Sequence, residues 1–125
     1  MKELCLDKAR EFEIIRLNFI QEATDHAIRG DAAQRAKQEA GVSSAIANVV
    51  HFTSAADDYA HKYLLKEKII TLDEQGKISK QLSKAAEQAT AENFEAAKNS
   101  LIELDSKIWE LMLEKVVSCE CQSKR

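Results

Sequence analysis

Two pairs of side chains have the spacing that carboxylate and histidine metal ligands use on helices. Asp58 and His61 are three residues apart and Glu22 and His26 are four apart, so each pair lies on one face of a helix. Di-iron bundles combine such pairs from different helices around one site. A hairpin turning at Gly30 leaves His26 and His61 about 39 Å apart along the helix axis. A hairpin turning at Gly41 instead leaves them about 15 Å apart. Because metal ligands must converge on one ion, we predict no metal site from these pairs.

The cysteines offer a second chemistry. Cys119 and Cys121 are separated by one residue near the end of the chain, and Cys5 lies near its start. In a bundle with an even number of helices these ends share one pole, where three thiols would suit a soft metal or a redox reaction. The C-x-C pattern alone is weak, and free thiols are the simpler interpretation. We keep a metal- or thiol-dependent protein using Cys5, Cys119 and Cys121 as an alternative.

Recognisable catalytic and nucleotide-binding motifs are missing from the sequence. It has no nucleophile elbow, no Walker A sequence and no G-x-G-x-x-G. The pattern therefore indicates no catalysis and no cofactor. A bundle enzyme or small-ligand binder without a recognisable motif remains a second alternative, and its sign would be a polar cavity with convergent acids.

Charge and hydropathy narrow the classes of partner. The net charge is −3, and the one row of lysines has no aromatic platform for bases beside it (Lys77, Lys80 and Lys84). No apolar run approaches the ~18 residues that a membrane span needs. The first residues carry acids where a signal peptide would be apolar, and an odd number of cysteines fits a reducing compartment. We expect a cytoplasmic protein with no nucleic-acid or membrane partner.

The composition predicts an all-α protein. The 125 residues include no proline, only 3 glycines and 18 alanines. Alanine, leucine, glutamate, lysine and glutamine are strong helix formers, whereas the residues that favour strands are few. Any functional side chain must therefore be positioned by helices.

The first half of the chain is predicted to form two long helices. Apolar residues at helical spacing predict a helix over 3–29 that ends at Gly30. Asp31 then resembles the start of a capping box, so a second helix over 31–70 follows after almost no loop. Gly41 leaves two alternatives open in this helix, a break at the glycine or a continuous helix through it.

The second half is predicted to form a loop and two more helices. Thr71-Leu72-Asp73-Glu74 has the capping-box pattern, and Gly76 is expected to end the turn. The following elements are a short helix over 79–89 capped by Ser79 and a long helix over 91–117 capped by Thr90.

The last helix carries two adjacent apolar seams. The first contains Phe94, Ala97, Leu101, Leu104, Ile108 and Leu111, and the second contains Ile102, Trp109, Met112 and Val116. Two seams make a wide apolar face, which is typical of a helix covered by more than one neighbour. The helix before the loop carries one seam, flanked by Phe52 and Tyr59.

These patterns together predict a single antiparallel up-down bundle of about four helices, one of them short. The domain spans 1–125, with 119–125 as a flexible tail. We interpret the chain as a protein-association module, either a homodimer, an adaptor or an inhibitor or immunity-type protein. Aromatic and methionine side chains are common at protein interfaces, and the candidate partner-binding residues are Phe52, Tyr59, Tyr63, Trp109 and Met112.

Overall fold

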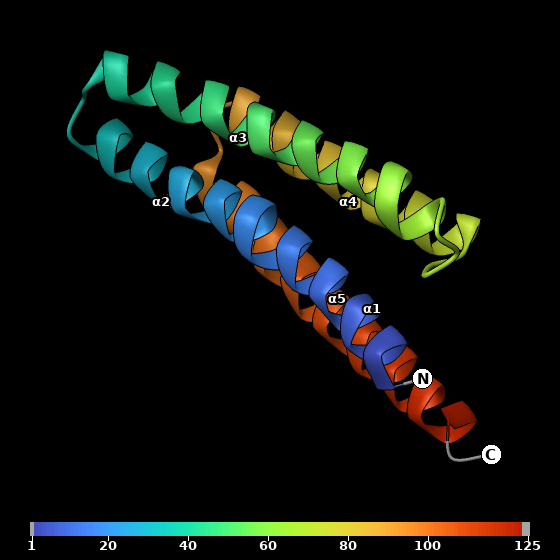
Figure 1. Cartoon of the computed structure of the whole chain (residues 1–125). Coiled ribbons are helices and arrows are strands. Elements are labelled where there is room, and N and C mark those ends of the chain that lie inside the picture. Colours follow the sequence, from blue (N-terminus) through green and yellow to red (C-terminus); the bar gives the residue numbers. More distant parts are fainter. Residues whose placement is uncertain (1, 124–125) are drawn as a thin grey trace.

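The chain folds into four helices packed antiparallel, as the sequence predicts (Figure 1). The computed structural model describes the backbone of residues 2–123 and the side chains of residues 7–116. The elements are α1 (Lys2–Ile14), η1 (Ile15–Ile20), α2 (Gln21–Arg35), α3 (Glu39–Tyr59), η2 (Ala60–Leu65), α4 (Leu72–Thr90) and α5 (Phe94–Ser123). There is no β-strand between residues 2 and 123.

The first helix runs without a break through α1, η1 and α2, a length of about 51 Å. The predicted helix end at Gly30 is therefore wrong. Gly30 is buried beside the ring of Phe94, and a Cβ atom added there would lie 2.5 Å from Phe94 Cε1. The glycine allows this close approach of α5 rather than ending the helix. Asp31, predicted as a helix cap, instead pairs with Arg35 inside α2 at 3.1 Å.

The first turn lies between Arg35 and Glu39, so α2 and α3 form a tight hairpin. The structure places the break a few residues before Gly41, which is in the first turn of α3. A Cβ atom on Gly41 would lie 2.9 Å from the Cβ of Ala33, so this glycine also serves a close helix approach. The second long helix ends at Leu65 with η2, short of the predicted residue 70.

All three inter-helix turns are built in the same way. Lys37, Lys68 and Glu92 each have positive φ, at 56°, 60° and 63°. In each turn the next amide donates to the carbonyl five residues before it, at 2.8 Å: Gln38 to Ala33, Ile69 to Leu64 and Asn93 to Gln88. This is the Schellman arrangement, which usually has glycine at the positive-φ position. Because other residues occupy these positions here, the glycines of the sequence do not mark the turns.

We expect glycine at these positions to stabilise the fold. The left-handed conformation is unfavourable for residues with a Cβ atom and easy for glycine, so Lys37→Gly and Glu92→Gly should each raise the free energy of unfolding by about 0.5–1 kcal/mol. Urea unfolding followed by circular dichroism measures the change. The matched control is Lys84→Gly in the middle of α4, which should lower stability by about 1 kcal/mol. Equal destabilisation at all three sites would contradict the turn geometry.

The start of α4 confirms the predicted capping box. The hydroxyl of Thr71 accepts from the amide of Glu74 at 3.1 Å, and the Glu74 carboxylate accepts from the amide of Thr71 at 2.8 Å. The helix begins directly after Thr71, so Gly76 and Ser79 are inside α4 and the predicted turn end and cap there are wrong. As a result α4 is a full-length member of the bundle.

The start of α5 differs from its predicted cap. Thr90 is still in α4, where its hydroxyl donates to the carbonyl of Ala86 at 2.8 Å. The side chain of Asn93 instead accepts from the amide of Ala96 at 3.3 Å and caps α5. The helix is described as far as Ser123, within the segment 119–125 that the sequence analysis assigns to a tail.

Two core clusters hold the helices together. The larger has residues from every helix, among them Phe12, Ile15, Leu64, Leu82 and Ile108. The smaller lies near the α2–α3 and α4–α5 turns and is mostly alanine, with Phe94 as its one aromatic ring. Small residues let the helices approach closely at that end, while the α1–α5 and α3–α4 pairs diverge toward the other end (Figure 1).

Candidate functional site

Aromatic side chains form a row between the first helix and the α3–η2 helix. The ring centroids of Phe19 and Tyr59 are 5.5 Å apart, and those of Tyr59 and Tyr63 are 4.6 Å apart. Farther along, His26 stacks on Phe52 at 5.5 Å. The structure thus brings together three of the candidate partner-binding residues, Phe52, Tyr59 and Tyr63, but it engages two of them in packing against the first helix.

Tyr59 also joins the two helices through its hydroxyl, which donates a hydrogen bond to the carboxylate of Glu11. Burial, together with this bond and the charge of Glu11, raises the pKa of the Tyr59 phenol far above its ordinary value. The phenol therefore stays protonated and keeps its hydrogen bond. Only Tyr63 leaves a large part of its ring exposed on this face.

The outer side of α5 carries an uncovered row of apolar side chains. Ile102, Trp109 and Leu113 are 48%, 42% and 45% exposed, and Ser106 between them is exposed as well. Positions 102, 106, 109 and 113 follow a 4-3-4 spacing, so they form a narrow line along one face of the helix. We call these four residues the α5 stripe.

The two predicted seams of α5 differ in burial. Leu101, Leu104 and Ile108 of the first seam are buried in the core. The second seam divides, because Met112 is only 6% exposed and packs in the core while Ile102 and Trp109 remain open. Met112 is thus not part of the exposed surface. Leu113 belongs to neither predicted seam, but it is exposed and lies four residues after Trp109, in line with the other exposed side chains.

Arg16 of η1 fixes Trp109 in its place. Its guanidinium carbon lies 4.7 Å from the centre of the indole ring, a distance at which a cation is attracted to the ring face. The same guanidinium donates to Asp105 at 3.2 and 3.3 Å and to Glu13 at 2.7 Å. The indole is therefore exposed but held, and an anchor that is held loses less conformational entropy on binding.

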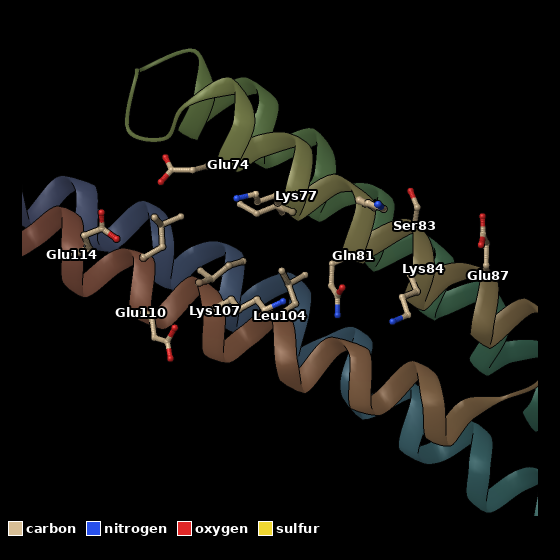
Figure 2. Close-up of a pocket in the computed structure, with 14 residues that line it drawn as sticks. Glu74, Lys77, Gln81, Ser83, Lys84, Glu87, Leu104, Lys107, Glu110 and Glu114 are labelled. Atoms are coloured by element: carbon tan, nitrogen blue, oxygen red, sulfur yellow. The ribbon is translucent and has the colours of Figure 1, made fainter.

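A groove of about 1000 Å³ runs between α4 and α5 (Figure 2). Its floor contains the apolar side chains of Ile78, Leu104 and Ile108, and its rims carry charged residues of both signs. Polar bridges join the two helices at two places. Gln81 donates to the carbonyl of Ser100 at 3.0 Å, and Lys115 pairs with Glu74 at 3.1 Å.

The acids of this groove do not converge. In Figure 2, Glu110 points away from α4, and Glu74 and Glu87 are at opposite ends of the row of labelled α4 residues. Lysines are interspersed with them, among them Lys77 and Lys84. The groove therefore has charged rims above an apolar floor. It does not have the convergent acids that the ligand-binding or catalytic alternative would require.

Glu74 should make stability depend on pH. Burial raises the pKa of its carboxyl, but hydrogen bonds from the amide of Thr71 and from Lys115 outweigh burial and leave the pKa below its ordinary value of 4.5. A carboxyl with a lowered pKa stabilises the fold fully above about pH 4.5, and this stabilisation is lost as the pH falls through the folded-state pKa. Glu74→Gln should therefore lose less stability between pH 6 and 3 (roughly the range in which carboxyls titrate) than the parent chain.

Thermal unfolding at several pH values measures this difference. Glu103→Gln is the control and should show a smaller difference, because the Glu103 carboxyl is exposed on α5 and its pKa is lowered mainly by its pair with Lys107. If Glu74→Gln and the parent chain lose stability in parallel, the bridge between α4 and α5 does not form in solution.

The histidines of the two pairs have different neighbours. His26 stacks on Phe52 in the middle of the α3–η2 helix, while the Nδ1 atom of His61 in η2 is 2.9 Å from Nε2 of Gln75 in α4. Among the side chains that the structure describes, no three histidine, cysteine, aspartate or glutamate residues are grouped to hold a metal ion. The side chains of Cys5, Cys119 and Cys121 lie outside the described residues.

In comparisons with known proteins, no protein family, no curated protein and no solved structure matches this chain. None of the helices in the described part of the chain is both long and apolar enough to cross a membrane. The residues of the chain itself define it as an antiparallel four-helix bundle with an exposed apolar stripe on one helix.

Proposed function

We propose that this chain is a protein-association module and that it binds its partner through the outer side of α5. One observation carries the proposal: the α5 stripe presents three large apolar side chains in one line, with an aromatic ring in the middle. Ile102 is about 160° around the helix from the buried Leu104, so the stripe faces away from the core. Apolar side chains grouped in this way on a surface are typical of interaction sites.

The types of residue in the stripe suit this role. Tryptophan and arginine dominate the binding energy of many interfaces, and here Arg16 holds Trp109 in a fixed position. Burying a whole leucine- or isoleucine-sized side chain contributes about 1.5–3 kcal/mol. Since the three large side chains of the stripe are about half exposed, covering them contributes about 3 kcal/mol in total.

The aromatic row is a weaker candidate for the same role. Phe52 and Tyr59 are partly covered by His26 and Phe19 of the first helix. Tyr63 is the one member of the predicted set on that face with a widely exposed ring. Binding there would rely on a single side chain, whereas the α5 stripe offers a continuous line.

Photo-crosslinking tests the proposal and captures the partner in the same experiment. A benzophenone amino acid replaces Asn99, which is exposed one turn before Ile102, and crosslinked products are identified by mass spectrometry in the source cells. We expect a protein adduct at this site that Trp109→Lys removes, because a lysine places a charge within the apolar contact.

The matched control carries the same probe at Ser54, an exposed position on α3. We expect that probe to give no adduct that depends on Trp109. If the two sites give the same products, or if Trp109→Lys leaves the Asn99 adduct unchanged, the α5 stripe is not the association surface.

A further inference from the structure

We infer that the partner presents an amphipathic helix whose apolar side chains cover the α5 stripe and whose basic side chains contact the glutamates beside it. This inference rests on the proposed function and adds the chemistry of the partner. It follows from the form of the stripe, from a row of charges along its edge and from the lack of ion-pair partners for two of these charges among the described residues.

The form of the stripe suits a helix. Its residues recur at the helical period and lie in a single line that spans about 17 Å, or roughly three turns. An amphipathic helix laid along this line presents apolar side chains at the same period, as in coiled coils and in other helix-mediated contacts. Because the line is only one side chain wide, charges at its edge must help to select the partner.

A row of four exposed charged residues borders the stripe on the side of the α4–α5 groove. It contains Glu103, Lys107, Glu110 and Glu114, which follow one another at helical spacing. We call these four residues the acidic row. It lies about 100° around α5 from the stripe, within reach of long side chains on a helix that covers the stripe. Three glutamates and one lysine make the row negative, which favours basic side chains on the partner.

Two of these glutamates have no ion-pair partner in the described part of the chain. Lys107 pairs with Glu103 at 3.0 Å and lowers the pKa of the Glu103 carboxyl, with a smaller contribution from Lys84. None of the ion pairs between residues 7 and 116 includes Glu110 or Glu114. In Figure 2 the Glu110 side chain points away from α4 and its lysines. Its charge is thus left for a partner on the outer side of α5.

The cations on the other side of the stripe are matched by acids. Arg16 reaches over the indole ring from the first helix, but the carboxylates of Glu13 and Asp105 accept its hydrogen bonds. Lys98 is near the start of α5, where Glu95 lines the same small pocket. The acidic row therefore sets the sign of the charge that a partner meets along the stripe.

Two synthetic peptides test the charge preference on the full chain. Both form amphipathic helices of about five turns with the same line of leucines, and the positions beside that line are lysine in one peptide and glutamate in the other. Binding is followed by the emission of Trp109. At low salt we expect the lysine peptide to bind about ten-fold more tightly, and salt should reduce the difference because it screens exposed charges. Equal affinities, or no binding of either peptide, would overturn the inference.

Charge reversal assigns this preference to the acidic row. Glu110→Lys with Glu114→Lys should weaken binding of the lysine peptide by about ten-fold. The matched control is Asp58→Lys with Glu87→Lys, which changes the net charge equally at exposed positions on α3 and α4 and should leave the affinity nearly unchanged. Circular dichroism verifies that the helices remain in both variants. If the two variants lose equal affinity, the peptide responds to total charge and the acidic row is not its site.

The Asn99 probe separates this inference from the proposed function. If Glu110→Lys with Glu114→Lys removes the Trp109-dependent adduct, both proposals are supported. If that variant leaves the adduct unchanged, or if the adduct contains a second copy of this chain, association through α5 stands and the basic helix is excluded. If no Trp109-dependent adduct forms, both proposals fail.

Discussion

Gly30→Ala is expected to destabilise the bundle, although alanine is the better helix former. In the middle of a helix, alanine is favoured over glycine by about 1 kcal/mol. At Gly30, however, the new methyl group would lie 2.5–2.8 Å from three carbon atoms of the Phe94 ring. That ring is buried in the smaller core cluster and is only 1% exposed. Overpacking of this kind costs about 1–3 kcal/mol, so we expect a net loss of about 1–2 kcal/mol in urea unfolding.

A double-mutant cycle assigns this loss to the Phe94 ring. In a Phe94→Leu background the side chain is smaller, so Gly30→Ala should become neutral or stabilising. The resulting coupling energy between the two positions should be about 1–3 kcal/mol. An unchanged loss in that background would mean that the two helices do not meet at this point.

Gly76→Ala is the matched control for helix propensity. Gly76 lies in α4, and a Cβ atom there would have no neighbour within 4 Å. The same substitution should therefore raise the free energy of unfolding by about 0.5–1 kcal/mol. Opposite signs at Gly30 and Gly76 would show that contact with α5, and not helix propensity, decides the effect at Gly30.

Phe12→Ala is expected to have the largest effect of any substitution considered. Phe12 of α1 is fully buried in the larger cluster, where the two helix pairs diverge. Removing a buried phenylalanine side chain costs about 3–5 kcal/mol, because the transfer free energy is lost and a cavity remains. Such a loss is a large part of the total stability of a chain of this size, and thermal unfolding should show a much lower midpoint.

Phe52→Ala removes the same group of atoms from a half-buried position. Phe52 packs against the larger cluster from outside and stacks on His26. Because part of this ring already contacts water, we expect less than half the loss seen for Phe12→Ala. If the two losses were equal, α1 would not be packed more tightly than the aromatic row.

The fold class could be predicted from the sequence because it depends on composition and on apolar periodicity. The capping box at Thr71 and Glu74 was also predictable, since both of its hydrogen bonds form between residues close in sequence. The predicted helix end at Gly30 and the predicted helix cap at Thr90 were wrong. Gly30 contacts Phe94, which is distant in sequence, and a local pattern cannot distinguish a glycine that ends a helix from one that lets another helix approach.

The turns were misplaced for a related reason. Their positive-φ residues are Lys37, Lys68 and Glu92, which have no special preference for that conformation. Backbone hydrogen bonds fix these turns. Because such bonds do not require particular side chains, the sequence does not reveal where the turns lie. A break at Gly41 was one of two alternatives that the sequence left open, and the turn lies a few residues before it, between Arg35 and Glu39.

The candidate surface could be predicted in part. The second seam pointed to Trp109, but it also included Met112, which the neighbouring helices bury. Met112 and Trp109 point about 60° apart around the helix, and the neighbouring helices cover only the first of them. The contact of Arg16 with Trp109 and Asp105 joins residues from opposite ends of the sequence, so no local spacing reveals it.

The most direct test of the central claim uses the fluorescence of Trp109, because the chain has one tryptophan and it lies in the α5 stripe. The measurement is acrylamide quenching of its emission with and without the protein that the Asn99 probe captures. If that protein covers the α5 stripe, quenching should fall and the emission should shift to shorter wavelength. Quenching that the captured protein leaves unchanged would contradict the account.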